Sequence, residues 1–144
     1  PIVFSRRASN TIDAAIALSS TANLGTATPA GGYGIPSSET ATASVGLTVQ
    51  KYGRTTSLTK GNITGTNVIV KVGYSSGTAR FVNQIIVESN TEFIGAGDSG
   101  SLLVTMDKNP VGLLFAGTSD GKLAVANPIG AVLIAFGVTI DDTP

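Results

Sequence analysis

The alternation of hydrophobic and polar positions predicts short β-strands over most of the chain. Val68, Val70 and Val72 fall on one face of such a strand, and the residues between them fall on the other, which is the period of two expected of a strand. The eighteen glycines and six prolines fit strands joined by tight turns. Beyond residue 44, the expected strands cover residues 44–51, 61–64, 67–72, 80–88, 101–106, 110–117 and 123–126.

An earlier alternation, over residues 11–18, predicts one more strand. One of its faces is apolar, and the other carries the carboxylate of Asp13. Residues 19–44 are strongly biased in composition, because 21 of the 26 are Ser, Thr, Ala, Gly or Pro, which favours a connection over a core element. We therefore expect residues 1–18 to end a first barrel, residues 19–44 to link two lobes, and residues 45–144 to form a second barrel with its C-terminal helix.

The pattern changes near the C-terminal end of the chain. Residues 119–122 contain the Asp-Gly pair of a tight hairpin, and apolar residues at helical spacing then predict a helix over residues 129–136. Asn127 is expected to cap this helix, because Pro128 suits the first helical position, and Gly137 is expected to end it. The chain is therefore predicted to be all-β with one short helix.

Composition and charge limit the possible partners. Hydrophobic residues make up 42% of the chain and charged residues 12%, which favours a compact core over disorder. Nine basic residues balance nine acidic ones, so the chain has no strong field of one sign to bind nucleic acid or an anionic membrane. No apolar run reaches the about 18 residues that would span a bilayer. We expect neither nucleic acid nor a membrane as a partner.

The absence of cysteine and histidine excludes several kinds of chemistry. Without cysteine there are no disulfides, thiolate zinc sites or cysteine nucleophiles. Without histidine the chain lacks the commonest metal ligand and the commonest general base near neutral pH, and no metal or organic cofactor is implied. The chain opens on Pro1 without an initiator methionine or a signal-peptide pattern, so we expect residue 1 to be an internal position of a longer parent.

A glycine-rich segment carries the candidate chemistry: residues 95–101 read Gly-Ala-Gly-Asp-Ser-Gly-Ser. A nucleophilic serine needs a sharp turn that exposes its hydroxyl, and it needs backbone N–H groups that converge where an oxyanion forms. Gly97 and Gly100 permit the backbone dihedrals of such a turn. The alternative is a glycine-rich turn between strands without any chemistry. Ser99 is therefore a candidate nucleophile.

The surroundings of this segment favour the first interpretation. Gly-Asp-Ser-Gly-Ser followed by an apolar strand resembles the nucleophile loop of the trypsin-like serine proteases. Residues 51–61, with their Gly-Arg-Thr-Thr turn, resemble the start of the second barrel in bacterial members of that family. Residues 111–117 resemble the strand after the nucleophile, and residues 127–136 resemble the C-terminal helix. The resemblance, over about residues 45–137, implies a six-stranded Greek-key β-barrel, preceded by the last strand of the first barrel.

The resemblance also implies roles for individual residues. Ser99 would form an acyl-enzyme with a peptide or protein substrate, and the N–H groups of Gly97 and Ser99 would form the oxyanion hole. Residues 10–17 resemble the strand that carries the catalytic aspartate in bacterial members, so Asp13 would orient a histidine. Asp98 is expected to hold the loop together through hydrogen bonds.

The substrate contacts implied by the resemblance lie on either side of the nucleophile. Phe93, six residues before Ser99, falls at the floor of the primary specificity pocket in the family, which argues against a pocket for Arg or Lys. The wall on which an extended peptide could pair as a strand would consist of Phe115, Ala116, Gly117 and Thr118.

The missing histidine is the main departure from the family. Without a base Ser99 stays an ordinary alcohol, so the chain alone is expected to be inactive. In the family this histidine lies in the first barrel, upstream of the aspartate. The first-barrel remnant is expected to contact this missing N-terminal lobe, or to self-associate through its unpaired edges.

Two alternative functions use the same residues. Asp98-Ser99-Gly100 matches the Asp-Ser/Thr-Gly signature of aspartic proteases, but Ala96-Gly97 replaces the usual bulky apolar pair and no second signature follows. A pseudoprotease or a peptide-binding β module would keep the same barrel without catalysis.

Overall fold

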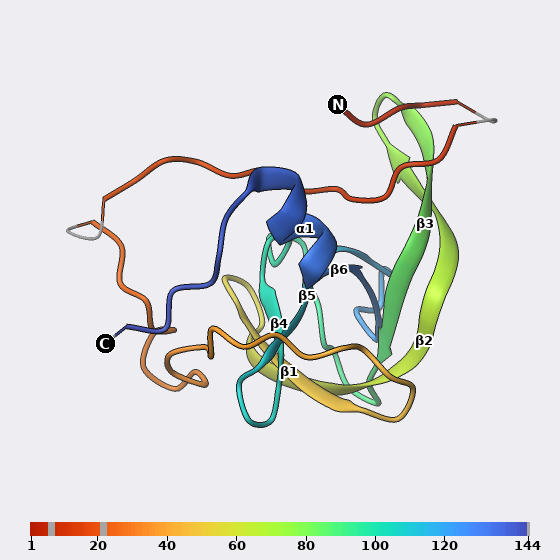
Figure 1. Cartoon of the computed structure of the whole chain (residues 1–144). Coiled ribbons are helices and arrows are strands. Elements are labelled where there is room, and N and C mark those ends of the chain that lie inside the picture. The colour runs from red at the N-terminus through yellow and green to blue at the C-terminus, as the bar shows by residue number, and fades with distance from the viewer. Residues whose placement is uncertain (6–7, 21–22, 144) are drawn as a thin grey trace.

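The computed structural model describes residues 1–5, 8–20 and 23–143 of the chain. Within these residues it contains six β-strands and one α-helix, shown in Figure 1. The elements are β1 (Thr48–Gly53), β2 (Ser57–Tyr74), β3 (Gly77–Glu88), β4 (Leu102–Thr105), β5 (Pro110–Gly117), β6 (Leu123–Pro128) and α1 (Ile129–Phe136).

The six strands form a closed barrel in the order β1-β2-β3-β6-β5-β4. Every neighbouring pair is antiparallel, and the pairing of β1 with β4 closes the barrel. Closure gives β1, β4, β5 and β6 a neighbouring strand on both sides, whereas β2 pairs only with β3 beyond Asn62. The predicted all-β barrel with a C-terminal helix is confirmed.

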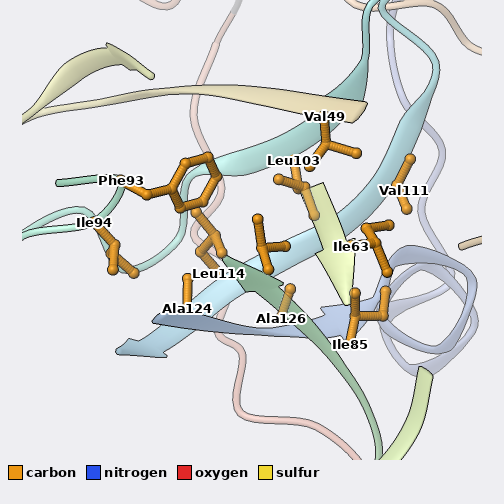
Figure 2. Packing of buried hydrophobic residues seen from close by; sticks show 11 residues of the cluster. Val49, Ile63, Ile85, Phe93, Ile94, Leu103, Val111, Leu114, Ala124 and Ala126 are labelled. Carbon is orange, nitrogen blue, oxygen red and sulfur yellow. The ribbon is translucent and has the colours of Figure 1, made fainter. Parts of the chain in front are cut away.

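The core lies inside this barrel, as Figure 2 shows. Val49 from β1, Ile63 from β2 and Leu103 from β4 are fully buried there, together with Phe93 from the segment after β3. Burying such a side chain contributes roughly 1.5–3 kcal/mol to stability, so the cluster of inward-facing residues supplies the main stabilisation of the fold. The period of two in the sequence arises because alternate residues of each strand face this core.

The long hairpin of β2 and β3 extends away from the rest of the barrel (Figure 1). The hydrophobic pattern predicted two strands here, residues 61–64 and 67–72, whereas the structure has the single strand β2. The register between β2 and β3 shifts three times between Ile63 and Val70, and Asn67 has a φ of 55°. These bulges explain the break in the alternation, because each extra residue reverses which side chains face inward.

The strand predicted over residues 11–18 is absent. Before residue 48, the described residues contain no strand or helix, only an isolated bridge between Asn10 and Phe81. Ile16 and Leu18, which the pattern placed on an apolar face, are exposed. A strand needs a partner for its backbone groups, and no other segment pairs with residues 11–18 here. The expected connection over residues 19–44 likewise has no strand or helix in its described part.

The predicted N-cap of the helix is also wrong. The residue that precedes α1 is Pro128, and no side-chain hydrogen bond caps the helix. Asn127 instead belongs to β6, and its amide bonds to other segments, as described below. Gly137 ends the helix in the left-handed conformation, with φ 63°, as predicted. Within the described residues, no helix is long and apolar enough to cross a membrane.

Candidate active site

Ser99 lies on a glycine turn in the segment between β3 and β4. Its side chain is exposed, and its hydroxyl donates a weak hydrogen bond of 3.4 Å to the backbone oxygen of Phe115. Gly97 and Gly100 have φ angles of 102° and 88°, a region that favours glycine. Within the described part of the chain, the N–H groups of Gly97 and Ser99 donate no hydrogen bond. Both donors are therefore available to a ligand beside the Ser99 hydroxyl.

Asp98 ties this turn to the connection between β1 and β2. Its carboxylate is completely buried and accepts hydrogen bonds from the Thr55 N–H at 2.7 Å, the Gly95 N–H at 2.9 Å and the Thr56 hydroxyl at 2.7 Å. Burial alone would raise the pKa of Asp98, but these hydrogen bonds and the charge of Lys51 outweigh it and hold the pKa well below its usual value. Asp98 therefore remains an anion and holds the loop together, as expected.

Lys51 supplies the charge that balances Asp98. Its ammonium lies 3.3 Å from the Asp98 carboxylate, and both side chains are fully buried. It also donates hydrogen bonds to the Thr56 hydroxyl and, at 3.1 Å, to the backbone oxygen of Ser57. Burial lowers the pKa of Lys51, and the attraction to Asp98 opposes that shift. This pair was not predicted from the sequence, although Lys51 lies on the same buried face of β1 as Val49.

Asp13 is held against the barrel although it belongs to no strand. Its N–H donates to the side-chain oxygen of Asn127 at 2.9 Å, and the Asn127 amide donates back to the Asp13 carbonyl at 2.8 Å. The Tyr74 hydroxyl donates to a carboxylate oxygen of Asp13 at 2.5 Å. Burial raises the pKa of Tyr74, and the nearby Asp13 carboxylate raises it further. The sequence does not indicate either partner, because residues 114 and 61 positions away carry no local signal.

No direct contact joins Asp13 and Ser99, and the two residues line different cavities. They are connected through aromatic residues. The Tyr74 ring lies 6.4 Å from the ring of Phe81, which lies 5.0 Å from the ring of Phe115, whose carbonyl accepts the Ser99 hydroxyl. A catalytic triad places an imidazole between its aspartate and serine, so separation of these two residues is compatible with such a triad.

A cavity of about 340 Å³ lies beside Ser99. One wall consists of residues 94–96 of the loop, and the other consists of residues 116–119 at the end of β5 and just after it. Ala116, Gly117 and Thr118, which the family resemblance implied as a substrate wall, thus line a cavity beside Ser99. Phe115 does not line the cavity, because its ring packs against Phe81.

Phe93 does not form the floor of this cavity, in contrast to the sequence-based expectation. It is fully buried in the barrel core (Figure 2), where its ring lies 5.9 Å from the ammonium of Lys51. Its N–H donates to the Gly121 carbonyl at 2.8 Å and its carbonyl accepts the Thr59 hydroxyl at 2.8 Å, which fixes the backbone with the ring inward. The neighbouring residues Glu92 and Ile94 line the cavity instead.

The closed antiparallel barrel with a serine on its glycine turn defines a chymotrypsin-like peptidase fold. The chain matches peptidase family S64 over residues 8–122, and it belongs to that family. Similar solved structures include a serine protease described as glutamic acid specific, which is 27% identical with a TM-score of 0.61. Another is the Cellulomonas bogoriensis chymotrypsin, which is 28% identical with a TM-score of 0.62. Thermobifida fusca protease A is 26% identical, with a TM-score of 0.63.

These similarities cover most of this chain and a smaller share of each relative. They cover 78%, 79% and 81% of this chain, in the same order, and 57%, 59% and 60% of the respective relatives. The chain thus spans less than two thirds of the length of each. No curated protein sequence matches the chain.

Proposed function

We propose that this chain is the nucleophile-bearing, C-terminal part of a serine endopeptidase. The observation that carries the proposal is the geometry at Ser99, where an exposed hydroxyl lies on a glycine turn beside a cavity of about 340 Å³. The unpaired N–H groups of Gly97 and Ser99 are suited to an oxyanion hole. Membership of a peptidase family supports the reaction class.

In the proposed reaction, an imidazole takes the proton of the Ser99 hydroxyl while its oxygen bonds to the scissile carbonyl carbon. The N–H groups of Gly97 and Ser99 stabilise the oxygen that becomes negative. The imidazolium then gives its proton to the leaving amine as the C–N bond breaks, which leaves an acyl ester on Ser99. Water hydrolyses this ester with the same imidazole as base, and Ser99 is regenerated.

The imidazole comes from outside these 144 residues, because they contain no histidine. We propose that an N-terminal lobe supplies it and that Asp13 orients it. The clamp formed by Asn127 and Tyr74 supports this role, because it holds the Asp13 carboxylate in place before a histidine arrives. The chain alone is then inactive, since removal of a catalytic histidine lowers kcat on the order of 10⁶-fold in a comparable triad enzyme.

The substrate in this proposal is an extended peptide. Residues 116–118 border the cavity at the C-terminal end of β5, where a peptide strand could form backbone hydrogen bonds along the wall. Such pairing would place a scissile bond beside Ser99 and one substrate side chain inside the cavity.

Labelling with a fluorophosphonate tests this function. The probe is applied to this chain and to a longer form that carries an upstream lobe with a histidine, each with a Ser99→Ala control. We expect labelling of the longer form only, and only where Ser99 is present. If both forms are folded and neither is labelled, the protease proposal fails, and a pseudoprotease or peptide-binding β module becomes the better account.

A further inference from the structure

The cavity beside Ser99 contains one ionisable side chain among its described lining residues, that of Glu92. The other lining residues are glycines, alanines, one isoleucine and residues with hydroxyl groups. No positive side chain lines the cavity in the described part of the chain. The carboxylate of Glu92 therefore sets the sign of the charge at the cavity wall.

Glycine residues make room for this side chain. A Cβ atom at Gly121 would lie only 2.7 Å from Cγ of Glu92, so the stem of Glu92 packs directly over the backbone of the β5–β6 turn. A Cβ atom at Gly95 would lie 3.4 Å from Oε1, which places the carboxylate next to the loop that carries Ser99. Within the described residues, no hydrogen bond to the Glu92 carboxylate is present. The carboxylate therefore remains available to a ligand.

The nearby charges do not neutralise Glu92. Lys51 is the cation that interacts with it through space, but Lys51 is completely buried and its ammonium is bonded to Asp98. The guanidinium of Arg54 lies against Gly97 and does not line the cavity. Asp120, in the turn after β5, accepts a hydrogen bond from the wall residue Thr118 at 2.6 Å, and the neighbouring Lys122 offsets its charge, so neither residue sets the charge of the cavity lining.

We propose that this cavity takes the side chain of Lys or Arg on the acyl side of the scissile bond, and that Glu92 pairs with its cationic end. This inference rests on the proposed function of Ser99. A carboxylate attracts an ammonium or guanidinium group through charge-assisted hydrogen bonds and repels another carboxylate. The chain would therefore differ from its glutamic-acid-specific relative, and the specificity follows from Glu92, not from Phe93.

Binding of p-aminobenzamidine to this 144-residue chain tests the proposal without any need for catalysis. Its fluorescence is titrated against the chain, in parallel with the uncharged isostere p-aminobenzamide. We expect the amidine to bind about tenfold more tightly than the amide, as for a hydrogen bond between charged groups. Glu92→Gln should abolish this difference. Glu39→Gln, which removes an equal charge from an exposed residue outside the cavity, should preserve it.

Three results would overturn the proposal: no binding of the amidine, equal binding of amidine and amide, or unchanged preference in Glu92→Gln. Circular dichroism establishes that the variant is folded, as expected for an exposed side chain. The fluorophosphonate experiment remains independent of this one. A longer form that is labelled at Ser99, combined with no amidine binding, rejects the specificity alone. Amidine binding without labelling rejects the protease function and leaves Glu92 as part of a cation-binding cavity without catalysis.

Discussion

Asn127 and Asp13 form reciprocal hydrogen bonds across 114 residues of sequence. The Asn127 side-chain oxygen accepts the Asp13 N–H, and the Asn127 amide donates to the Asp13 carbonyl. Asn127 is completely buried, so it substitutes for the neighbouring strand that the Asp13 backbone lacks in this chain. The barrel thereby holds the backbone of Asp13, which lies in the irregular segment before it, and the Tyr74 hydroxyl holds the Asp13 carboxylate.

Replacing Asn127 by Ala should release Asp13. The variant leaves the N–H and the carbonyl of Asp13 without these partners, and we expect a loss of roughly 1–3 kcal/mol in the free energy of unfolding. Hydrogen exchange of the Asp13 amide should become faster, while the amides of β3 and β5 keep their protection. Asn62→Ala, which removes an exposed bond to the Thr48 hydroxyl, is the matched control. Unchanged exchange at Asp13 would contradict the clamp.

Acid should destabilise the fold in part through Asp98. Its pKa is lowered in the folded chain, so its contribution to stability is complete above the ordinary aspartate pKa of about 3.9 and is lost as the pH falls below that value. We expect Asp98→Asn to lower stability by about 3–5 kcal/mol near neutral pH, because it leaves the buried Lys51 unpaired. The variant should also show a flatter decline of stability in acid. Urea unfolding between pH 2 and pH 7 measures both effects.

Two control variants distinguish the effect of the buried Lys51–Asp98 pair from the effect of removing any carboxylate charge. Asp107→Asn removes an exposed carboxylate and should leave the acid dependence unchanged. Lys51→Met combined with Asp98→Asn should recover part of the lost stability, since no charge then stays buried without a partner. Equal acid dependence of the wild type and Asp98→Asn would show that Asp98 does not carry the effect.

The strands could be predicted from the sequence where another segment of the same chain pairs with them. Core residues such as Val49 and Leu103 could be predicted from the alternation of apolar and polar residues. This alternation identifies the inward-facing residues even where the predicted strand ends are off by a few positions. The same pattern over residues 11–18 predicted a strand that the structure lacks. Alternation reports which residues could share a face, but it carries no information on whether a partner strand exists.

The candidate site was predictable in its backbone and less so in its side chains. The residues around Ser99 lie beside a cavity, and the glycine turn that carries them is a local feature of the sequence. Counting back from Ser99 selected Phe93 for the cavity, yet the ring points into the core and Glu92 lines the cavity. Spacing gives the position of a residue along a loop but not the direction of its side chain. Asn127 was missed because its Asn-Pro pair also fits a helix cap.

Gly97→Ala should disturb the turn before Ser99 for two reasons. Its φ of 102° is strained for any L-residue with a side chain, and the added Cβ would collide with the Arg54 guanidinium and the Thr55 hydroxyl. We expect a loss of roughly 1–3 kcal/mol in stability. We also expect fluorophosphonate labelling of the longer form to slow about 100-fold, as when one oxyanion donor is lost.

Gly100→Ala is the comparison that isolates the collision. Gly100 also has a positive φ, of 88°, but a Cβ there would meet no atom within 4 Å. It should therefore share the backbone strain and lack the steric clash, so its stability should lie between that of the wild type and that of Gly97→Ala. If Gly100→Ala proves the more destabilising of the two, the close approach of Arg54 to Gly97 has no energetic consequence.

The apolar side chains before the barrel should make the isolated chain self-associate. Ile16 and Leu18 are 58% and 102% exposed, and Val3 and Leu24 add further exposed apolar surface. Removing such surface from water is favourable, and a second copy offers the same surface when the proposed N-terminal lobe is absent. Sedimentation velocity should therefore show an average mass that rises with concentration.

Substitution identifies the surface responsible. The double variant Ile16→Ser/Leu18→Ser should remain monomeric at concentrations where the wild type associates. Ile69→Ser, at a similarly exposed isoleucine on β2, should associate like the wild type, since it lies on the barrel and not in the N-terminal segment. The longer form with its upstream lobe should also be monomeric, because that lobe would cover residues 11–18. A wild-type chain that stays monomeric at all concentrations would show that this apolar segment does not drive self-association.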